Sequence, residues 1–196
     1  MAYCDDVERE DQRFNVVTVR TRGPVTLGAD RAHAMTSACG ICGTTSLDAV
    51  EVRSDPLPDG PAVAAEALLA MPGLLREGQR VFEATGGLHA AGLFSPDGRL
   101  LLVREDIGRH NAVDKVVGAA ALAGDLPLHD RLLVVSGRAG FEIVQKAAVA
   151  GIPVLAAVSA PSSLAADAAE RLGMTLVGFL RGDGYNVYCG AGRILG

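Results

Sequence analysis

The chain has 196 residues, 49% of them hydrophobic, which fits one ordinary globular domain with a small appendage and a substantial core. Its 18 basic and 23 acidic side chains give a net charge of −5, which argues against unspecific nucleic-acid binding. Any anionic ligand must therefore be held by a local cluster of cations. No apolar run is long enough to span a membrane and no signal peptide begins at Met1, so we expect a cytoplasmic protein without a membrane partner.

The first predicted element is a strand over residues 14–20, where apolar and polar residues alternate. Residues 37–43 (Ser-Ala-Cys-Gly-Ile-Cys-Gly) show neither strand nor helix periodicity, and their glycines favour a mobile loop. Residues 53–61 are rich in proline, aspartate and glycine and are typical of an exposed connection.

The loop carries two thiols three residues apart, Cys39 and Cys42. Half of a zinc site is one interpretation, but a closed structural site needs four ligands and the chain has no second pair. A thioredoxin-type pair would stand at a helix N-terminus, and no helix pattern follows promptly. A chance spacing is the third alternative. The pattern favours a reactive thiol on a loop with a second thiol beside it. The other cysteines, Cys4 and Cys189, are too few for a disulfide framework, and we expect Cys189 to be a small buried residue.

After residue 61 the sequence alternates between helical and strand patterns. Helices are predicted over 61–70, with Asp59 as the cap and Pro61 in the first turn, and over 74–85, 109–123, 140–150 and 162–172. Strands are predicted over 88–95, 99–104, 131–136, 152–158, 174–180 and 186–189, the first two forming a hairpin. Strands that alternate with helices need right-handed crossovers, so we expect a mixed but mostly parallel sheet with helices on both faces.

Three loops at strand ends carry polar chemistry. Residues 104–111 lead into a helix, and Arg109 and His110 would suit an anion there. The alternative is a charged helix cap in which Asp106 caps the helix and Arg109 pairs with Glu105. Residues 136–140 (Ser-Gly-Arg-Ala-Gly) would allow the close approach of a phosphate, which alone is weak evidence. In residues 179–186 a nucleobase such as guanine could stack on Phe179 or Tyr185 and bind Asp183, whereas a plain hairpin turn is the equal alternative.

These motifs together resemble the FdhD family of formate dehydrogenase accessory sulfurtransferases. The resemblance rests on residues 37–43, 85–91 (Thr-Gly-Gly-Leu-His-Ala-Ala), 105–115 (Glu-Asp-Ile-Gly-Arg-His-Asn-Ala-Val-Asp-Lys), 136–138, 159–165 and 175–181. It covers nearly the whole chain, from about residue 15 to residue 194. It implies a cytidine-deaminase-like three-layer α/β/α sandwich.

The resemblance also implies a function in maturing the molybdenum cofactor of formate dehydrogenase. A cysteine desulfurase would load sulfur on Cys39 as a persulfide, with Cys42 assisting, and the sulfur would pass to the molybdenum of the bis-molybdopterin guanine dinucleotide cofactor. The bound substrate would be that cofactor, with a guanine nucleotide as a partial mimic and no protein-bound zinc. The partners would be the desulfurase, formate dehydrogenase and a second copy of the chain. The cofactor's guanine dinucleotide would lie on residues 179–184, that is Phe179, Leu180, Arg181, Gly182, Asp183 and Gly184. We add Arg109 and His110 as phosphate contacts or as cations that keep Cys39 ionised.

By the same resemblance, residues 1–36 are the remnant of a small N-terminal domain, 37–60 are the cysteine loop and its connection, and 61–196 are the α/β domain. Two rival functions remain. A zinc nucleoside deaminase needs His-x-Glu on one helix and Pro-Cys-x-x-Cys on the next, but His89 is followed by two alanines and is better read as a structural, hydrogen-bonded histidine. A noncatalytic chaperone for the cofactor or the apo-dehydrogenase would tolerate the loss of Cys39.

Overall fold

The computed structural model describes residues 2–3, 17–18, 20, 23–24 and 56–196. The chain forms two compact units, Met1–Ala34 and Met35–Gly196. In the first unit, β1 (Ala2–Tyr3) pairs antiparallel with β2 (Val17–Thr18), which falls within the strand predicted over 14–20. Cys39, Cys42 and the rest of the loop predicted over 37–43 lie outside the described residues.

A six-stranded sheet with the order β5-β4-β6-β7-β8-β9 is the centre of the second unit. Its strands are β4 (His89–Phe94), β5 (Leu100–Asp106), β6 (Leu132–Val135), β7 (Val154–Ala157), β8 (Thr175–Arg181) and β9 (Gly184–Cys189). The mixed sheet is confirmed, but parallel pairing is confined to β6, β7 and β8, so the expectation of a mostly parallel sheet is wrong for the flanks. The connection between β5 and β6 makes these two strands run in the same direction, but they do not pair because β4 lies between them. At the other side of the sheet, a tight turn makes β9 run antiparallel to β8.

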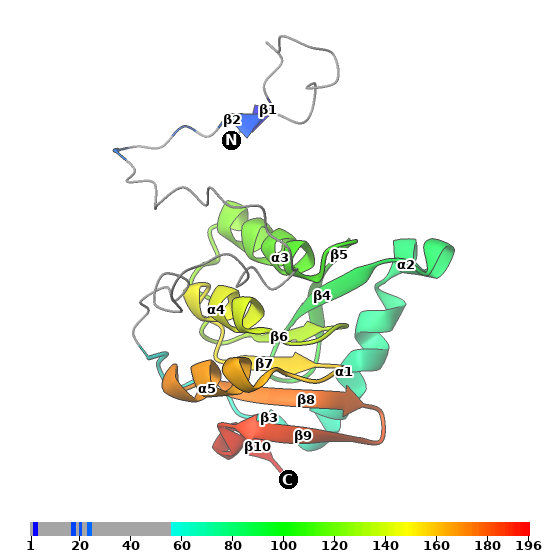
Figure 1. Ribbon diagram of the computed structural model, residues 1–196, viewed down its shortest axis with the longest axis vertical. Helices are drawn as coiled ribbons and strands as arrows, with labels where there is room; N and C mark the ends of the chain where they lie inside the picture. Colours follow the sequence, from blue (N-terminus) through cyan, green and yellow to red (C-terminus); the bar gives the residue numbers. More distant parts are fainter. Residues whose placement is uncertain (1, 4–16, 19, 21–22, 25–55) are drawn as a thin grey trace. The chain divides into compact units, whose positions relative to one another are not determined.

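Helices cover both faces of this sheet, as Figure 1 shows: α3 (Arg109–Ala123), α4 (Phe141–Val149) and α5 (Ser163–Arg171) follow one another along one face, and α1 (Ala65–Glu77) lies behind the other. Successive strand residues point to opposite faces. Accordingly, Leu133 and Val135 of β6 pack with α3, α4 and α5, whereas Leu132 and Val134 pack in the core on the α1 side. Both faces of β6 and β7 are therefore buried, which explains their short, wholly apolar sequences.

The helical segment before the sheet differs from the prediction. It begins at Ala65 rather than at residue 61, and neither Asp59 nor another side chain caps it. The reason is a contact across the chain: β3 (Val63–Ala64) pairs in parallel with β10 (Ile194–Leu195), which follows the short 3-10 helix η3 (Ala191–Arg193). α1 then continues through Pro72 to Glu77, and a separate α2 (Arg80–Thr85) ends at Gly86, as predicted, with a φ of 68°.

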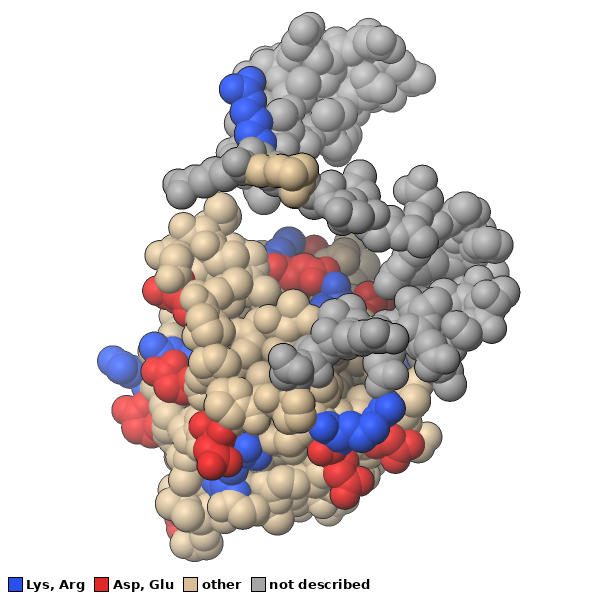
Figure 2. Space-filling model, turned by 90° about the vertical axis from the view of Figure 1, so that its left-hand side faces the viewer, with Lys and Arg blue, Asp and Glu red and all other residues tan. Residues whose placement is uncertain are grey.

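On the face shown in Figure 2, acidic and basic side chains are interspersed among uncharged ones. No helix in the described part of the chain is long and apolar enough to cross a membrane.

Candidate functional site

The polar loops found in the sequence meet at one edge of the sheet. β5, β6, β7 and β8 run in the same direction, so their carboxyl ends share an edge, and β4 begins there because it is antiparallel to both neighbours. Loops outside the carboxyl ends of strands are the usual ligand sites of such folds. The topology therefore brings residues 105–111, 136–140, 158–162 and 179–184 to the same edge.

Backbone hydrogen bonds fix three of these loops relative to one another. The Ser159 N–H donates to the Gly137 carbonyl at 3.4 Å, and the Phe179 N–H donates to the Ser159 carbonyl at 3.2 Å. The Ser162 N–H donates to the Ala139 carbonyl at 3.1 Å, and Ala139 forms an isolated parallel bridge with Pro161. The loops that follow β6, β7 and β8 are thus joined to one another by backbone hydrogen bonds and form one continuous surface.

The two carboxylates that precede α3 are used for structure. Asp106 accepts from the Gly108 N–H at 2.8 Å and from the Asn111 amide at 3.1 Å, and it pairs with Lys115 at 2.6 Å. The hydrogen bond from Lys115, then that from the Gly108 N–H, holds the pKa of Asp106 below its usual value. Asp106 thus closes the turn that leads into α3, but the N-cap residue is Gly108 and no side chain caps the helix, so the predicted capping role of Asp106 is wrong.

Glu105 does not pair with Arg109, and that alternative is wrong. Its carboxylate instead accepts from the N–H groups of Val81 and Phe82, at 2.9 and 2.7 Å. These are early N–H groups of α2, which no side chain of α2 itself caps. Glu105 therefore serves as a capping group supplied by β5, and Arg109 is left without a carboxylate from its own loop.

Arg109 and His89 lie against the turn that follows β6. A Cβ placed on Gly137 would stand 3.3 Å from His89 Nδ1 and 3.7 Å from Arg109 Cδ. Among the described residues, Arg109 Nε is buried and has no hydrogen-bond partner. Buried polar atoms of this kind are uncommon and costly, because their hydration is lost without replacement. An unpartnered guanidinium nitrogen beside a glycine turn is well suited to an anion.

His110 points to a different neighbour. Its Nδ1 lies 3.9 Å from Glu142 Oε2, and Glu142 is also 3.8 Å from Lys146. Burial lowers the pKa of His110, and the charges of Arg109 and Lys146 lower it further against the opposing effect of Glu142. The neutral imidazole is thus favoured, and Arg109 is the fixed cation of the pair.

The hairpin between β8 and β9 carries the predicted nucleotide residues. Phe179 is 38% exposed and has a φ of 52°, a left-handed conformation that is strained for an aromatic residue. Arg181, Gly182 and Asp183 are exposed, but the Leu180 side chain is fully buried, so only its backbone is available to a ligand. Tyr185 packs partly against the core on the α1 side. Of the two candidate rings, Phe179 is the more accessible one.

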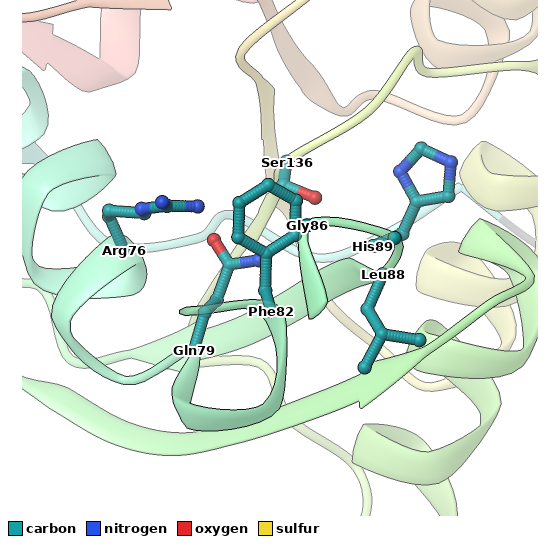
Figure 3. A pocket seen from close by; sticks show the side chains of 8 residues that line it. Arg76, Gln79, Phe82, Gly86, Leu88, His89 and Ser136 are labelled. Atoms are coloured by element: carbon teal, nitrogen blue, oxygen red, sulfur yellow. The ribbon is translucent and has the colours of Figure 1, made fainter. Parts of the chain in front are cut away.

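A hollow of about 450 Å³ opens beside this edge, between α1, α2 and the start of β4 (Figure 3). It is lined by Arg76, Gln79, Phe82, Gly86, Gly87, Leu88, His89 and Ser136. His89 makes no side-chain hydrogen bond to another described residue, so the sequence-based interpretation of a hydrogen-bonded structural histidine is wrong. Arg76, Gln79 and Phe82 were missed, because their helical pattern gave no sign that they face the same space.

Two further sequence predictions concern metal and the last cysteine. The described residues contain no group of three histidine, cysteine or acidic side chains able to hold a metal ion. Cys189 packs against the core, and its Sγ donates to the Met174 carbonyl at 3.3 Å. Burial raises the pKa of the thiol above its usual value. Cys189 is half-buried, whereas the sequence predicted a small buried residue.

A mixed sheet with three helices on one face and one on the other defines a three-layer α/β/α sandwich of the cytidine-deaminase type. A guanine deaminase from Nitrosomonas europaea has the same fold, with a TM-score of 0.50 at 19% identity over 67% of this chain and 91% of that one. A model of the FdhD/NarQ family matches residues 2–195, and the chain belongs to that family.

Other similarities agree with this assignment. The sulfur carrier protein FdhD of Nocardia farcinica is 56% identical over 98% of this chain and 70% of its own length. The crystal structure of a proposed formate dehydrogenase accessory protein from Desulfotalea psychrophila matches with a TM-score of 0.65 and 34% identity, over 71% of this chain and 59% of that one. The chain spans about two thirds of the length of the curated relatives that it matches.

Proposed function

We propose that the chain is a sulfur carrier that supplies sulfur to the molybdenum cofactor of formate dehydrogenase. Its membership in the FdhD/NarQ family supports this most, together with a relative named sulfur carrier protein FdhD at 56% identity. The described site adds a second argument, because a guanidinium with a buried nitrogen that no described residue satisfies, glycine turns and an exposed ring suit a large anionic nucleotide. The cofactor is the substrate in this proposal, and it is not bound permanently.

Loading would take place on Cys39. Its thiolate attacks the outer sulfur of a persulfide on a cysteine desulfurase, so that one S–S bond forms as another breaks. The desulfurase thiolate leaves, and Cys39 becomes the persulfide without a net change of oxidation state. This exchange requires an accessible, ionised thiol.

Release would use Cys42 as the reductant. Its thiolate attacks the inner sulfur of the Cys39 persulfide, forming a Cys39–Cys42 disulfide and expelling the outer sulfur as HS⁻ for the molybdenum. Both electrons gained by the departing sulfur come from the two thiols. A cellular thiol then reduces the disulfide and restores the carrier.

The guanine dinucleotide of the cofactor would lie along residues 179–184. Phe179 offers the exposed ring, Asp183 an acceptor for the guanine amine, and Arg109 a charge for the phosphates, whereas the neutral His110 would act as a hydrogen-bonding group. A free guanine nucleotide should be a partial mimic. The remaining partners in this proposal are formate dehydrogenase and a second copy of the chain.

Mass spectrometry tests the carrier chemistry directly. The chain is incubated with a cysteine desulfurase and cysteine, and intact masses and peptides are compared among the wild type, Cys39→Ala and Cys42→Ala. We expect a reducible gain of one sulfur atom on Cys39 that persists in Cys42→Ala and is lost in Cys39→Ala. Without its reductant, the Cys42→Ala protein should keep this sulfur longer.

Cys189→Ala is the matched control, because burial raises the pKa of that thiol and it should take no part in loading. If the Cys39→Ala protein supports formate dehydrogenase maturation as well as the wild type does, the carrier mechanism is wrong and a noncatalytic chaperone is favoured.

A further inference from the structure

A second concave region lies away from the candidate site, between α3 and the part of the sheet formed by β4 and β5. Its volume of about 440 Å³ falls within the range of about 300 to 1,000 Å³ that is usual for small-molecule pockets. Leu101 and Leu102 of β5 bound it on one side, Ala119 and Ala123 of α3 on the other, and Leu128 closes it beyond the helix. We call this region the α3 groove. It shares no lining residue with the hollow beside α2 or with the loops of the candidate site.

The α3 groove is open because α3 presents small side chains to the sheet in its last turns. In its earlier turns, Val113 and Val116 fill the space between the helix and the sheet. Further along the helix that space is met by Ala119, Ala120 and Ala123, which line the groove. A methyl group reaches less far than a branched side chain, so the helix and the sheet leave room between them at this end.

The apolar lining of the α3 groove is aliphatic. Leu93, Ala120 and Leu128 are buried residues of the core, whereas Leu101 lines the groove with 39% of its surface exposed. A ligand that covers Leu101 would remove apolar surface from water, which is favourable. Among the described residues no aromatic side chain lines the groove, so no ring is available for stacking. An alkyl chain fits such a surface, because its contacts with leucine and alanine need no particular direction.

The charged residues of the α3 groove differ between its two ends. Arg104 lies near the carboxyl end of β5 and is exposed, and among the described residues its side chain donates only to the Val103 carbonyl, at 2.9 Å. α3 starts just after β5 ends and packs against it, so the helix runs back along the strand. Asp125, which follows α3, therefore lies toward the other end, as does Arg131, which is already paired with Asp130. The groove thus offers a cation without a described carboxylate partner at one end and a carboxylate at the other.

We propose that the α3 groove binds an alkyl monocarboxylate, with its chain over Ala119 and Ala123 and its carboxylate at Arg104. The guanidinium and the carboxylate form charge-assisted hydrogen bonds, and the chain covers the aliphatic lining. Asp125 disfavours a second carboxylate at the far end of the chain, because the two negative charges repel each other. The groove contains no residue of the sulfur-carrier site, so this proposal stands or falls separately from sulfur loading on Cys39.

Titration of the isotope-labelled full chain, followed by the NMR signals of its backbone amides, tests this proposal with three ligands of matched length. Octanoate has the chain and one carboxylate, octanol lacks the charge, and suberate carries a second carboxylate at the far end. We expect octanoate to shift the amide signals of Leu101, Ala119 and Ala123 with a Kd on the order of 1 mM. Suberate should bind roughly threefold more weakly, because its second carboxylate would meet Asp125.

Two substitutions separate the contributions of charge and of space. Arg104→Gln should weaken octanoate by roughly threefold, the modest effect of an exposed ion pair, and leave octanol unchanged. Ala123→Leu fills the groove, and should weaken octanoate and octanol alike by roughly tenfold, because the chain loses its apolar surface.

Ala121→Leu is the matched control, because it adds the same volume at an exposed position of α3 that does not line the groove. It should leave the affinity for octanoate unchanged. Thermal melting of both leucine variants separates lost binding from lost folding. If Ala123→Leu does not fold, the comparison of Arg104→Gln with the wild type and of suberate with octanoate still decides the question.

The proposal is wrong if octanoate leaves these amide signals unshifted at concentrations on the order of 10 mM. It is equally wrong if suberate binds as tightly as octanoate, or if Ala121→Leu and Ala123→Leu reduce the affinity to the same extent. Light scattering tests the other possible occupant, a second copy of the chain. A smaller assembly for Ala123→Leu but not for Ala121→Leu would show that the groove is a contact between copies, and would overturn the proposal.

Discussion

Removing the Glu105 carboxylate should release α2 from the rest of the fold. α2 is short and buries none of its side chains, so hydrophobic packing contributes little to holding it. The hydrogen bonds from the Val81 and Phe82 N–H groups to Glu105, at 2.9 and 2.7 Å, are the main described contacts of its first turn. We therefore expect Glu105→Ala to unfold α2 locally and leave the sheet intact.

The size of the effect follows from what is lost. A helix cap is worth about 0.5 to 2 kcal/mol, and this one adds a negative charge at the helix N-terminus, which is favourable to the helix dipole. A loss of about 1.4 kcal/mol would raise the open population of α2 by about tenfold. Lys115 bonds to the backbone carbonyl of Glu105 at 2.9 Å, so its contact should survive the substitution.

Amide hydrogen exchange measures this change at individual residues. The Val81 and Phe82 amides should exchange roughly tenfold faster in Glu105→Ala, while amides of β6 and β7 keep their protection. Glu83→Ala is the matched control, because it removes an exposed carboxylate from the same helix without touching the cap. Unchanged exchange at Val81 and Phe82 in Glu105→Ala would refute the argument that β5 caps this helix.

Two other substitutions test the packing and charge of the sheet edge. A Cβ on Gly178 would lie 2.6 Å from Pro161 Cδ, so Gly178→Ala should cost about 1 to 3 kcal/mol of unfolding free energy by chemical denaturation. Gly182→Ala, which meets nothing within 4 Å, should cost far less; equal losses would contradict the close packing. His110 has a pKa lowered from its usual 6.5, so the unfolded chain binds its proton more readily and the folded state loses stability as the pH falls below 6.5. The melting temperature of His110→Gln should therefore fall less than that of the wild type between neutral and mildly acidic pH, and parallel curves would show that burial of this imidazole is not responsible.

Local signals explain which parts of the fold could be predicted. Glycines at helix ends, such as Gly86 and Gly124 with positive φ, and the Pro-Asp-Gly turn before β5 act through their own backbone preferences, so they can be recognised without knowledge of the fold. The start of α1 could not be predicted, because Val63 becomes a strand residue only by pairing with Ile194. Contacts across such distances leave no periodic trace in either segment.

The same limit applies to the candidate site. The sequence pointed to Asp106 as a cap of α3, but its carboxylate accepts from the N–H of Gly108, two residues away, and no side chain caps the helix. The alternative pairing of Glu105 with Arg109 is wrong, because the actual partners of Glu105, in α2, are more than twenty residues distant. The hollow was missed for the same reason, since its lining residues come from segments that only the tertiary fold brings together.

These assignments also explain how a chain with a net charge of −5 can leave a cation available at this edge. Three acidic groups near the starts of α3 and α4 are already engaged: Glu105 caps α2, Asp106 pairs with Lys115, and Glu142 lies between His110 and Lys146. An engaged carboxylate offers less of its charge to a second partner, so the net charge of the chain says little about this position. Arg109 keeps its charge beside the glycine turn after β6, with a buried nitrogen that no described residue satisfies. A carboxylate introduced there by Gly137→Asp should therefore reduce the affinity for anionic nucleotides more than an equal change in charge elsewhere on the surface.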